Sequence, residues 1–304
     1  MKLLSECLHS CAGCEVSLVD NGPDMLEFMR QLEVVHMPLL VDGKYFGQEG
    51  TGKEMVIPRA DVAIVSGGVA NRDHLGILKK VRQRCDCLVA LGTCATHGGI
   101  PALINQWPVS EAMRAVFSRF SNGRELKFVQ IPEMLDRVYA LDEKVRVDLM
   151  LPGCPPRSSE ILHVLKGLVG RQDPGLPSKS VCDSCPVARE GKGGVKKLRR
   201  FLDNSVLDVN RPLEEMRCFL EQGFLCMGPV TAAGCAGRGA PLCIRAGVPC
   251  RGCFGPARPG GNQLLDMINA LASNGIDWKS IVDRPSLLRF SGAHGLLRPA
   301  RKRQ

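Results

Sequence analysis

The chain's most unusual feature is a set of cysteines whose spacing suits metal ligation. Fifteen cysteines occur in 304 residues, and an odd total argues against a closed framework of disulfides. Many spaced thiols in a reducing compartment point to metal instead. The shortest repeats of this kind are Cys11-x-x-Cys14, Cys182-x-x-Cys185 and Cys250-x-x-Cys253. Iron–sulfur clusters and zinc both accept four thiolates, so the pattern predicts one of these two kinds of centre.

Four of the cysteines follow the ends of predicted strands. Cys11 and Cys14 follow a strand at 2–8, and the other two, Cys94 and Cys154, follow later strands. Parallel strands of an open α/β sheet present their carboxyl ends at one ligand-binding edge, so these thiols can converge there. Glycines in the same loops would let the backbone approach closely and donate N–H groups to sulfur: Gly92, Gly98, Gly99 and Gly153. Zinc would fit the same four thiols, and a thioredoxin-like redox pair would fit the first two alone.

The elements that must position these cysteines alternate between strand and helix patterns. Strands are expected at 2–8, 33–41, 61–66, 87–92 and 145–152. Helices are expected at 15–32, 71–84, 110–120 and 158–169. The apolar runs at 62–65 and 88–91 lack polar alternation, as do strands covered on both faces. The pattern predicts an α/β fold with a doubly wound parallel sheet.

The pattern changes near residue 175, where the chain becomes rich in Cys, Gly and Pro. Only 195–202 and 264–273 have clear helical periodicity beyond this point. We therefore expect three parts: a doubly wound domain at 1–175, a Cys-rich domain at 176–262, and a C-terminal helix with a basic tail at 263–304. So little apolar periodicity cannot build a core alone, and bound metal would supply the missing stability.

The cysteines of the Cys-rich region fall into two sets of four. The first set is Cys182, Cys185, Cys218 and Cys226. The second set is Cys235, Cys243, Cys250 and Cys253. Two four-thiolate sets suit two further 4Fe-4S clusters, and a pair of structural zinc ribbons is the alternative.

Three segments resemble the proximal-cluster motifs of NiFe hydrogenase small subunits. They are Cys11-Ala12-Gly13-Cys14-Glu15, Gly92-Thr93-Cys94-Ala95-Thr96-His97-Gly98-Gly99 and Leu151-Pro152-Gly153-Cys154-Pro155-Pro156. The resemblance implies a flavodoxin-like fold for this part of the chain. It also implies that these four cysteines hold the 4Fe-4S cluster nearest the NiFe centre.

The resemblance continues through the Cys-rich region. It implies that the set beginning at Cys182 holds a distal 4Fe-4S cluster and the set beginning at Cys235 a medial one, for three clusters in all. Many periplasmic relatives have a histidine where this chain has Cys182. Many also have a proline where this chain has Cys243, which leaves a three-iron medial cluster. Cys243 should therefore complete a four-iron cluster here.

The activity that this resemblance implies is electron relay. Electrons from hydrogen oxidation at a NiFe centre in the large subunit would enter at the proximal cluster, pass to the medial one and leave from the distal one. No catalytic residue is then expected in this chain. Glu15 beside Cys14 would take part in hydrogen bonding or proton movement, or would only face a helix dipole. Cys7, Cys85 and Cys87 fit no set and are expected as core or strand residues.

The all-cysteine clusters and the N-terminus without a leader pattern look most like cytoplasmic group 3 enzymes, closest to the viologen-reducing type. Such enzymes pass electrons to heterodisulfide reductase through an iron–sulfur adaptor. A deazaflavin reductase or an NAD(P) diaphorase is the alternative acceptor. The zinc-stabilised interaction module and a complex I-like, quinone-linked relay remain open as other functions.

Charge and hydropathy exclude two classes of partner. The formal charge of +9 would fall by roughly 6 with three clusters on twelve thiolates, which leaves little drive toward nucleic acid. No apolar run approaches the roughly 18 residues of a membrane helix. Neither nucleic-acid binding nor direct membrane insertion is expected.

Overall fold

The computed structural model describes residues 1–41, 43–46, 51–117, 132–176, 179–191, 194–199, 211–236 and 240–299. Contacts between Cα atoms divide the chain into two units. Unit 1 comprises Met1–Pro174 and Gly292–Gln304, and unit 2 comprises Gly175–Ser291. The chain thus leaves unit 1 after Pro174 and returns to it for its last residues. The predicted C-terminal helix lies in unit 2, and residues 300–304 of the predicted tail lie outside the described residues.

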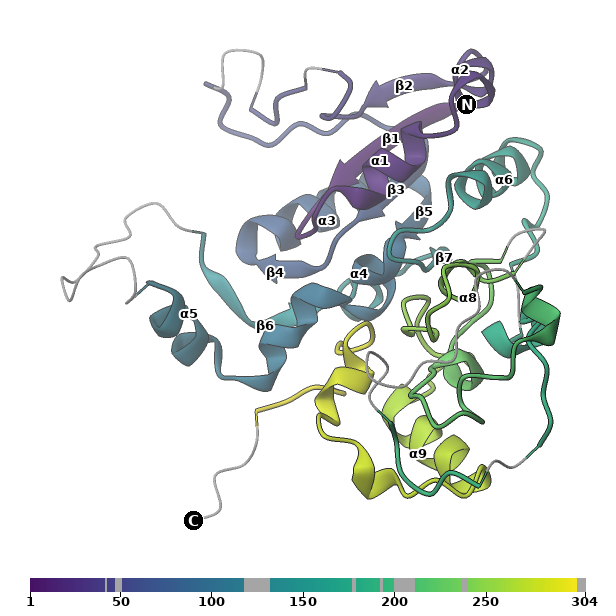
Figure 1. Cartoon of the computed structure of the whole chain (residues 1–304). Coiled ribbons are helices and arrows are strands. Elements are labelled where there is room, and N and C mark those ends of the chain that lie inside the picture. Colours follow the sequence, from purple (N-terminus) through teal and green to yellow (C-terminus); the bar gives the residue numbers. More distant parts are fainter. Residues whose placement is uncertain are drawn as a thin grey trace. The chain divides into compact units, whose positions relative to one another are not determined.

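Unit 1 contains a five-stranded sheet in the order β2-β1-β3-β5-β7, with every neighbouring pair parallel (Figure 1). The strands are β1 (Lys2–Cys7), β2 (Glu33–His36), β3 (Ala60–Ser66), β5 (Cys85–Leu91) and β7 (Leu149–Leu151). Each of the five predicted strands is present, although β2 and β7 are shorter than expected. The predicted doubly wound parallel sheet is confirmed.

Helices connect these strands or, in the case of α6, follow the last one. They are α1 (Gly13–Val19), α2 (Pro23–Met29), α3 (Arg72–Arg84), α4 (Gly92–His97), α5 (Val109–Phe117) and α6 (Ser158–Val169), with the 3₁₀ turns η1 (Ile100–Gln106) and η2 (Leu141–Glu143). The single helix predicted at 15–32 was wrong. Gly22 adopts a φ of 54°, and Pro23 begins a second helix, because its fixed φ and missing N–H suit a first helical position. Residues 118–120 of the predicted helix at 110–120 lie outside the described residues.

Alternate side chains of β1 pack against helices on opposite faces of the sheet. Leu3 lines an apolar cavity with side chains of α1, α2 and α6, and Leu4 belongs to a core cluster with Leu78 and Val81 of α3. Figure 1 shows α1 and α3 on either side of the strands. Outside the main sheet, β4 (Val69–Asn71) and β6 (Met134–Tyr139) form an antiparallel pair. Apolar cores on both faces fix the sheet edge that carries the first predicted cysteine group.

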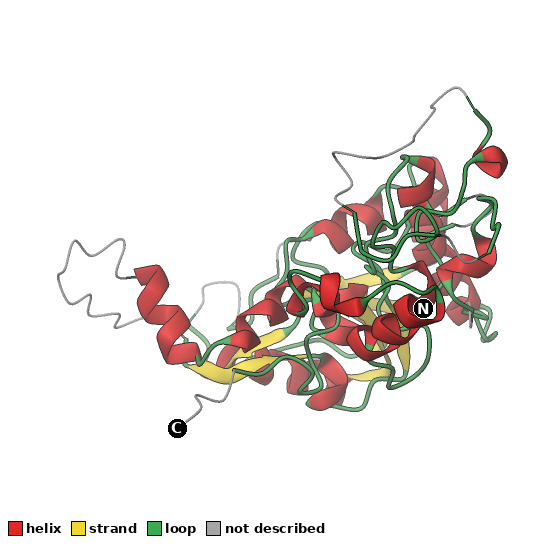
Figure 2. Cartoon of the chain, turned by 60° about the horizontal axis from the view of Figure 1, so that its bottom comes forward, coloured by secondary structure: helices red, strands yellow, loops and turns green. Residues whose placement is uncertain are grey.

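Unit 2 has a different construction. Apart from α9, its described helical elements are short: η3 (Val181–Ser184), η4 (Leu213–Glu215), η5 (Gly228–Val230), α8 (Leu242–Arg245), α9 (Gln263–Ser273), η6 (Trp278–Ser280) and η7 (Pro285–Leu288). Its described residues contain isolated β-bridges but no strand. Figure 2 colours the strands yellow, the helices red and the loops green. The predicted helix at 264–273 is present as α9. The helix predicted at 195–202 was wrong for 195–199, which are not helical, and the rest lies outside the described residues.

No helix among the described residues combines the length and apolar character needed to span a bilayer.

Candidate metal centres

The four cysteines predicted at the sheet edge, here called the sheet-edge group, are Cys11, Cys14, Cys94 and Cys154. They come from three connections that follow β1, β5 and β7. Cys14 lies in the first turn of α1, after Ala12 in a left-handed conformation with φ of 60°, and Cys94 lies in α4 directly after β5. Cys14 and Cys94 are buried, and Cys11 is exposed. The topology of the parallel sheet therefore brings these four residues to one edge.

A pair of hydrogen bonds ties two of these connections together. The N–H of Thr93 donates to the carbonyl of Gly153 at 2.8 Å, and the N–H of Gly153 donates to Oγ1 of Thr93 at 2.8 Å. Thr93 is buried. Thr93 directly precedes Cys94, and Gly153 directly precedes Cys154. The two bonds therefore fix the positions of these cysteines relative to each other.

Two glycines leave room for sulfur. At Gly92, with φ of 82°, a Cβ atom would lie 2.3 Å from Sγ of Cys14; at Gly99, with φ of 52°, it would lie 2.7 Å from Sγ of Cys94. Both distances are shorter than real contacts allow, and both φ values favour glycine. The sulfur atoms thus lie against bare backbone, as the sequence predicted for these loops.

The thiols of this group affect one another electrostatically. Burial raises the pKa of Cys94 to about 12, and the neighbouring Cys154 and Cys11 raise it further. Burial also raises the pKa of Cys14 above the ordinary range, as do Glu15 and the other three cysteines. Buried thiols that oppose each other's ionisation need a compensating cation to become thiolates. The group has the donor chemistry of a metal site.

Glu15 lies buried beside this group, with 3% of its surface exposed. Its Oε1 accepts a hydrogen bond from the hydroxyl of Ser66 at the end of β3. Within the described part of the chain, its Oε2 is buried without a hydrogen-bond partner. A buried carboxylate oxygen in that state is costly unless another group reaches it.

The first set of unit 2, here called the 182–226 group, comprises Cys182, Cys185, Cys218 and Cys226. Burial raises the pKa of Cys182 to about 12, and the charges of the other three members contribute to the increase. All four line one small cavity. The structure therefore gathers Cys218 with this set, although its spacing in sequence is the least regular.

Local backbone structure fixes the first two cysteines of the 182–226 group. They lie in and just after η3, which a capping box begins: the N–H of Ser180 donates to Oδ2 of Asp183 at 2.8 Å. Arg189 donates from Nη2 to the carbonyl of Cys182 at 2.8 Å. Its positive charge opposes the rise in the pKa of Cys182 and Cys185. Arg189 thus favours thiolates at this end of the group.

The second set of unit 2, here called the 235–253 group, comprises Cys235, Cys243, Cys250 and Cys253. Cys243 lies in α8, and Cys250 is buried. Burial raises the pKa of Cys250, and the nearby Cys226, Cys253 and Cys243 raise it further. Cys235 is half-buried and packs against the apolar core of unit 2, which contains Cys250. The N–H of Cys250 also donates to Sγ of Cys226 at 3.3 Å, so the two groups of unit 2 adjoin.

Backbone N–H groups point at sulfur in both units. Hydrogen bonds to sulfur come from Ile100 at Cys94, from Val187 at Cys185, and from Gly252 at Cys250. Cys226 accepts two, from Gly228 and Cys250. Such donors stabilise thiolate and tune the potential of iron–sulfur clusters. The donor set fits 4Fe-4S clusters in chemistry and in number of thiols.

Among the described residues, no three His, Cys, Asp or Glu side chains converge closely enough to share a single metal ion.

Sequence reasoning missed a buried glutamine that supports the 235–253 group. Gln263, fully buried at the start of α9, donates from Nε2 to the carbonyls of Gly252 and Gly255 at 3.3 and 3.1 Å. Its Oε1 accepts a hydrogen bond from Ser291 at 2.8 Å. Gln263 thereby fixes the loop that contains Cys253. Gln263 belongs to no recognised motif, and a polar residue at the start of a helix is common. The sequence therefore gave no indication of this contact.

The three cysteines assigned to no set lie outside the groups. Cys85 and Cys87 lie at the amino end of β5, the opposite end from Cys94. Burial raises the pKa of Cys85 to about 11. Cys7 ends β1, and its sulfur lies 3.1 Å from Oγ of Ser10. All three are strand residues, as expected.

Comparison with known proteins gives a family match. Residues 11–168 match the model of the NADH ubiquinone oxidoreductase 20 kDa subunit family. A vhu subunit of the F420-non-reducing hydrogenase of Methanocaldococcus jannaschii is 34% identical over 93% of this chain and 92% of its own length. The iron-sulfur subunit of the F420-non-reducing hydrogenase of Archaeoglobus profundus is 31% identical over 90% of this chain and 88% of its own.

A solved structure is similar to part of this chain. A chain of an NAD+-reducing [NiFe]-hydrogenase in the H2-reduced state has 30% identity and a TM-score of 0.52, with 58% of this chain and 95% of that chain covered. The two F420-non-reducing relatives, by contrast, extend over about nine-tenths of this chain, and so through most of unit 2.

Proposed function

The chain belongs to the NiFe hydrogenase small subunits, of the F420-non-reducing type, and we propose that it relays electrons through three 4Fe-4S clusters. Its membership of this family implies that it associates with a large subunit. The observation that carries the proposal is the convergence of Cys11, Cys14, Cys94 and Cys154 at one sheet edge, since nothing in their chain spacing alone requires it.

In this proposal each cysteine group holds one cluster. The sheet-edge group would hold the proximal cluster, the 235–253 group the medial one and the 182–226 group the distal one. When bound, a 4Fe-4S cluster accepts and releases one electron at a potential that the protein sets. The chain's own part is to supply thiolates, N–H donors to sulfur and a water-poor surrounding. The adjoining positions of Cys226 and Cys250 support a short step between the two groups of unit 2.

Glu15 and Arg189 have different roles in this proposal. Glu15 would position the sheet-edge group through Ser66, and its second oxygen would bond to a group of the large subunit or to a proton carrier. The guanidinium of Arg189 would favour the reduced, more negative state of the cluster held by Cys182 and Cys185, and so raise its potential. A higher potential at the last cluster favours electron flow away from the hydrogen-splitting centre.

The large subunit would bind beside the sheet-edge group. On α1, Glu15, Ser17 and Leu18 are buried, whereas Val16 is 61% and Val19 39% exposed. Leu26 of α2 is 69% exposed and lines the same apolar cavity as Val19. Exposed apolar patches of this kind mark protein interfaces. We place the complex in the cytoplasm, since a thiol-rich chain suits a reducing compartment.

The acceptor would be an iron–sulfur adaptor of heterodisulfide reductase, as the resemblance to the viologen-reducing type implies, and the relatives' description as F420-non-reducing argues against a deazaflavin acceptor. The alternative acceptors are a deazaflavin reductase and an NAD(P) diaphorase. Either would be the partner if this chain differs from these relatives in its electron acceptor. The complex I-like alternative is less well supported, because the family match ends at residue 168, before the two groups of unit 2.

The test is anaerobic affinity purification from the native source, followed by identification of the associated subunits and assay of hydrogen-dependent viologen reduction. The proposal predicts a NiFe large subunit, the adaptor and brown, active material. Val16→Asp should abolish recovery of the large subunit, whereas Val282→Asp, at a fully exposed valine of unit 2, should leave it unchanged. Colourless material with bound zinc and no large subunit would overturn the proposal.

A further inference from the structure

The last described segment of the chain lies against the helix that contains Cys94. Residues 292–299, here called the C-terminal strap, belong to unit 1 although they follow unit 2 in sequence. Ala293 and Leu297 of the strap are 1% and 5% exposed. A terminal segment with buried side chains is tied down and forms part of the fold.

The strap satisfies the carboxyl end of α4. The N–H of Ala293 donates to the carbonyl of His97 at 3.1 Å. At Gly98, which caps α4 with φ of 84°, a Cβ atom would lie 2.8 Å from Cβ of Ala293. The N–H of Gly98 in turn donates to the carbonyl of Cys94 at 3.2 Å. A single helical turn thus separates Cys94 from a close backbone contact with the strap.

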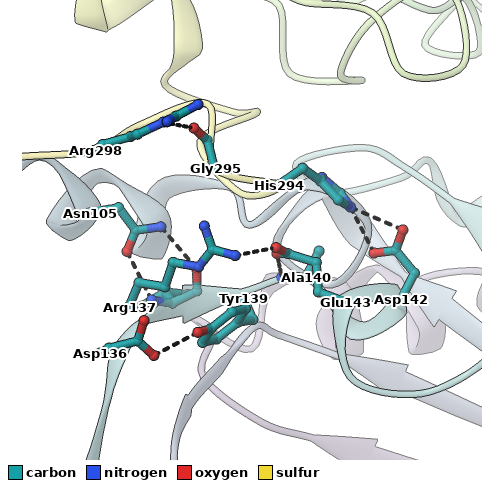
Figure 3. Close-up of polar contacts among 11 residues, drawn as sticks. Asn105, Asp136, Arg137, Tyr139, Ala140, Asp142, Glu143, His294, Gly295 and Arg298 are labelled. Atoms are coloured by element: carbon teal, nitrogen blue, oxygen red, sulfur yellow. Dashed lines mark hydrogen bonds and ion pairs between the residues drawn. The ribbon is translucent and has the colours of Figure 1, made fainter.

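An ion pair holds the strap at this place. Figure 3 shows the ring of His294 pointing at Asp142, with Nε2 2.9 and 3.0 Å from the two carboxylate oxygens. His294 adopts a φ of 54°, a conformation that non-glycine residues rarely take. Backbone strain of this kind persists only where surrounding contacts compensate for it.

Asp142 is itself held by a fixed turn. It lies in η2, where the N–H of Ala140 donates to Oε2 of Glu143 at 3.0 Å. Arg137 of β6 donates from Nη2 to Oε1 of Glu143 at 2.9 Å, and Figure 3 shows this contact next to the strap. The carboxylate that binds His294 therefore belongs to a structured element of unit 1.

His97 connects the ion pair to α4. Its ring lies edge-on to the ring of His294, with centroids 6.4 Å apart, and its Nδ1 is 2.7 Å from Oγ1 of Thr96. Thr96 also donates to the carbonyl of Gly92 at 3.2 Å, within α4. Burial lowers the pKa of His97 to about 4, and the charge of His294 lowers it further. His97 is thus neutral at ordinary pH and joins the strap to α4 by packing and hydrogen bonding.

We propose that His294 and Asp142 are positioning residues that clamp the C-terminal strap onto α4 and so fix Cys94 for cluster binding. The inference rests on the proposed function in that Cys94 is taken as a cluster ligand. A helix of six residues, Gly92–His97, is too short to be stable by itself. The strap supplies one of its missing carboxyl-terminal hydrogen bonds and closes the space beside Gly98.

The test uses the holo complex with four variants, and Cys94→Ala as the reference for EPR. His294→Asn and Asp142→Asn each remove the pair, and asparagine tolerates the left-handed φ at 294. The swap variant Asp142→His with His294→Asp restores the ion pair with its two side chains exchanged. Aspartate at 294 also tolerates the left-handed φ. Glu133→Gln is the matched control, because it breaks an ion pair with Arg72 elsewhere in unit 1.

The first readout is hydrogen–deuterium exchange. We expect amides of residues 92–99 to exchange roughly 3- to 10-fold faster in both single variants, near wild-type rates in the swap, and unchanged in the control. The second is EPR of the reduced complex. The signal that disappears in Cys94→Ala should shift or broaden in the single variants and recover in the swap, while the other cluster signals stay unchanged.

Two outcomes would overturn the clamp: faster exchange confined to the strap with 92–99 unchanged, or a swap variant that behaves like the single variants. Iron is measured in the same samples. Wild-type protein without iron would contradict the proposed function, whereas the exchange data would still decide whether the strap holds α4.

Discussion

The two units place their cysteines by different physical means. In unit 1, the apolar residues that line the two faces of the parallel sheet include none of the sheet-edge cysteines, and the sheet-edge group lies at the rim of that structure. In unit 2, five of the eight group cysteines belong to the apolar core or pack against it: Cys226 and Cys250 are among its buried residues, and Cys185, Cys218 and Cys235 pack against it. Unit 1 is thus a fold with a cysteine group at its rim, whereas in unit 2 cysteine side chains form part of the apolar core itself.

The largest expected effect is that of iron removal. Anaerobic chelation should leave unit 1 folded and destabilise unit 2 much more strongly, because proposed cluster ligands are part of the core only in unit 2. Protease cleavage within 175–291 should accelerate roughly 100-fold or more, with cleavage within 1–174 changed about twofold at most. Mass spectrometry of timed digests gives both rates. Equal resistance of the two units in iron-free protein would remove the contrast between them.

Single cysteine variants sharpen the same contrast. Cys94→Ala should reduce hydrogen-dependent viologen reduction roughly 100-fold or more, since the sheet-edge group loses a ligand while unit 1 stays folded. Cys226→Ala should reduce activity similarly and also make unit 2 sensitive to protease, because Cys226 is part of its core. Cys85→Ala is the control: it removes a buried cysteine outside the groups and should cost about 1 kcal/mol of stability with little effect on activity. Unchanged activity in Cys94→Ala would exclude the proximal role.

A milder change tests the 235–253 group. Cys243 is the second residue of α8, and proline is tolerated in the first turn of a helix. Cys243→Pro should therefore give a folded complex with a three-iron medial cluster and activity within about tenfold of wild type. EPR of the oxidised complex would report the three-iron signal. Cys243→Ser retains an oxygen ligand and serves as the matched control; a folded Cys243→Pro complex with no three-iron signal would refute the ligand assignment.

The smallest effect is a pH dependence confined to unit 1. Hydrogen bonding to Asp142 raises the pKa of His294 above its ordinary value. The pair therefore contributes its full stability below the unfolded-state pKa and loses it as pH rises through the folded-state pKa. Since both partners are partly exposed, the loss should be about 0.5 kcal/mol, or about 1–2 °C in Tm. Thermal unfolding from pH 6 to 9 should show this decline in wild type and not in His294→Asn; a decline of equal size in both would assign it to other groups.

Sequence reasoning succeeded where periodicity and topology act together. The apolar runs at 62–65 and 88–91 predicted covered strands, and the rule for carboxyl edges then predicted where Cys94 and Cys154 would lie. It failed at 15–32, where helical periodicity continues through Gly22-Pro23 but the backbone cannot. In unit 2 the structure of 195–199 and the contacts of Gln263 depend on tertiary contacts with no periodic signature. No contact of the C-terminal strap was predicted either, because a single ion pair between residues 142 and 294 leaves no local pattern.

The most direct test of the central claim is the metal content of the anaerobically purified chain by iron, sulfide and zinc analysis together with Mössbauer spectroscopy. The account predicts about twelve iron and twelve sulfide per chain, all in 4Fe-4S form. A chain with about three tetrahedral Zn–S centres and no iron would contradict it.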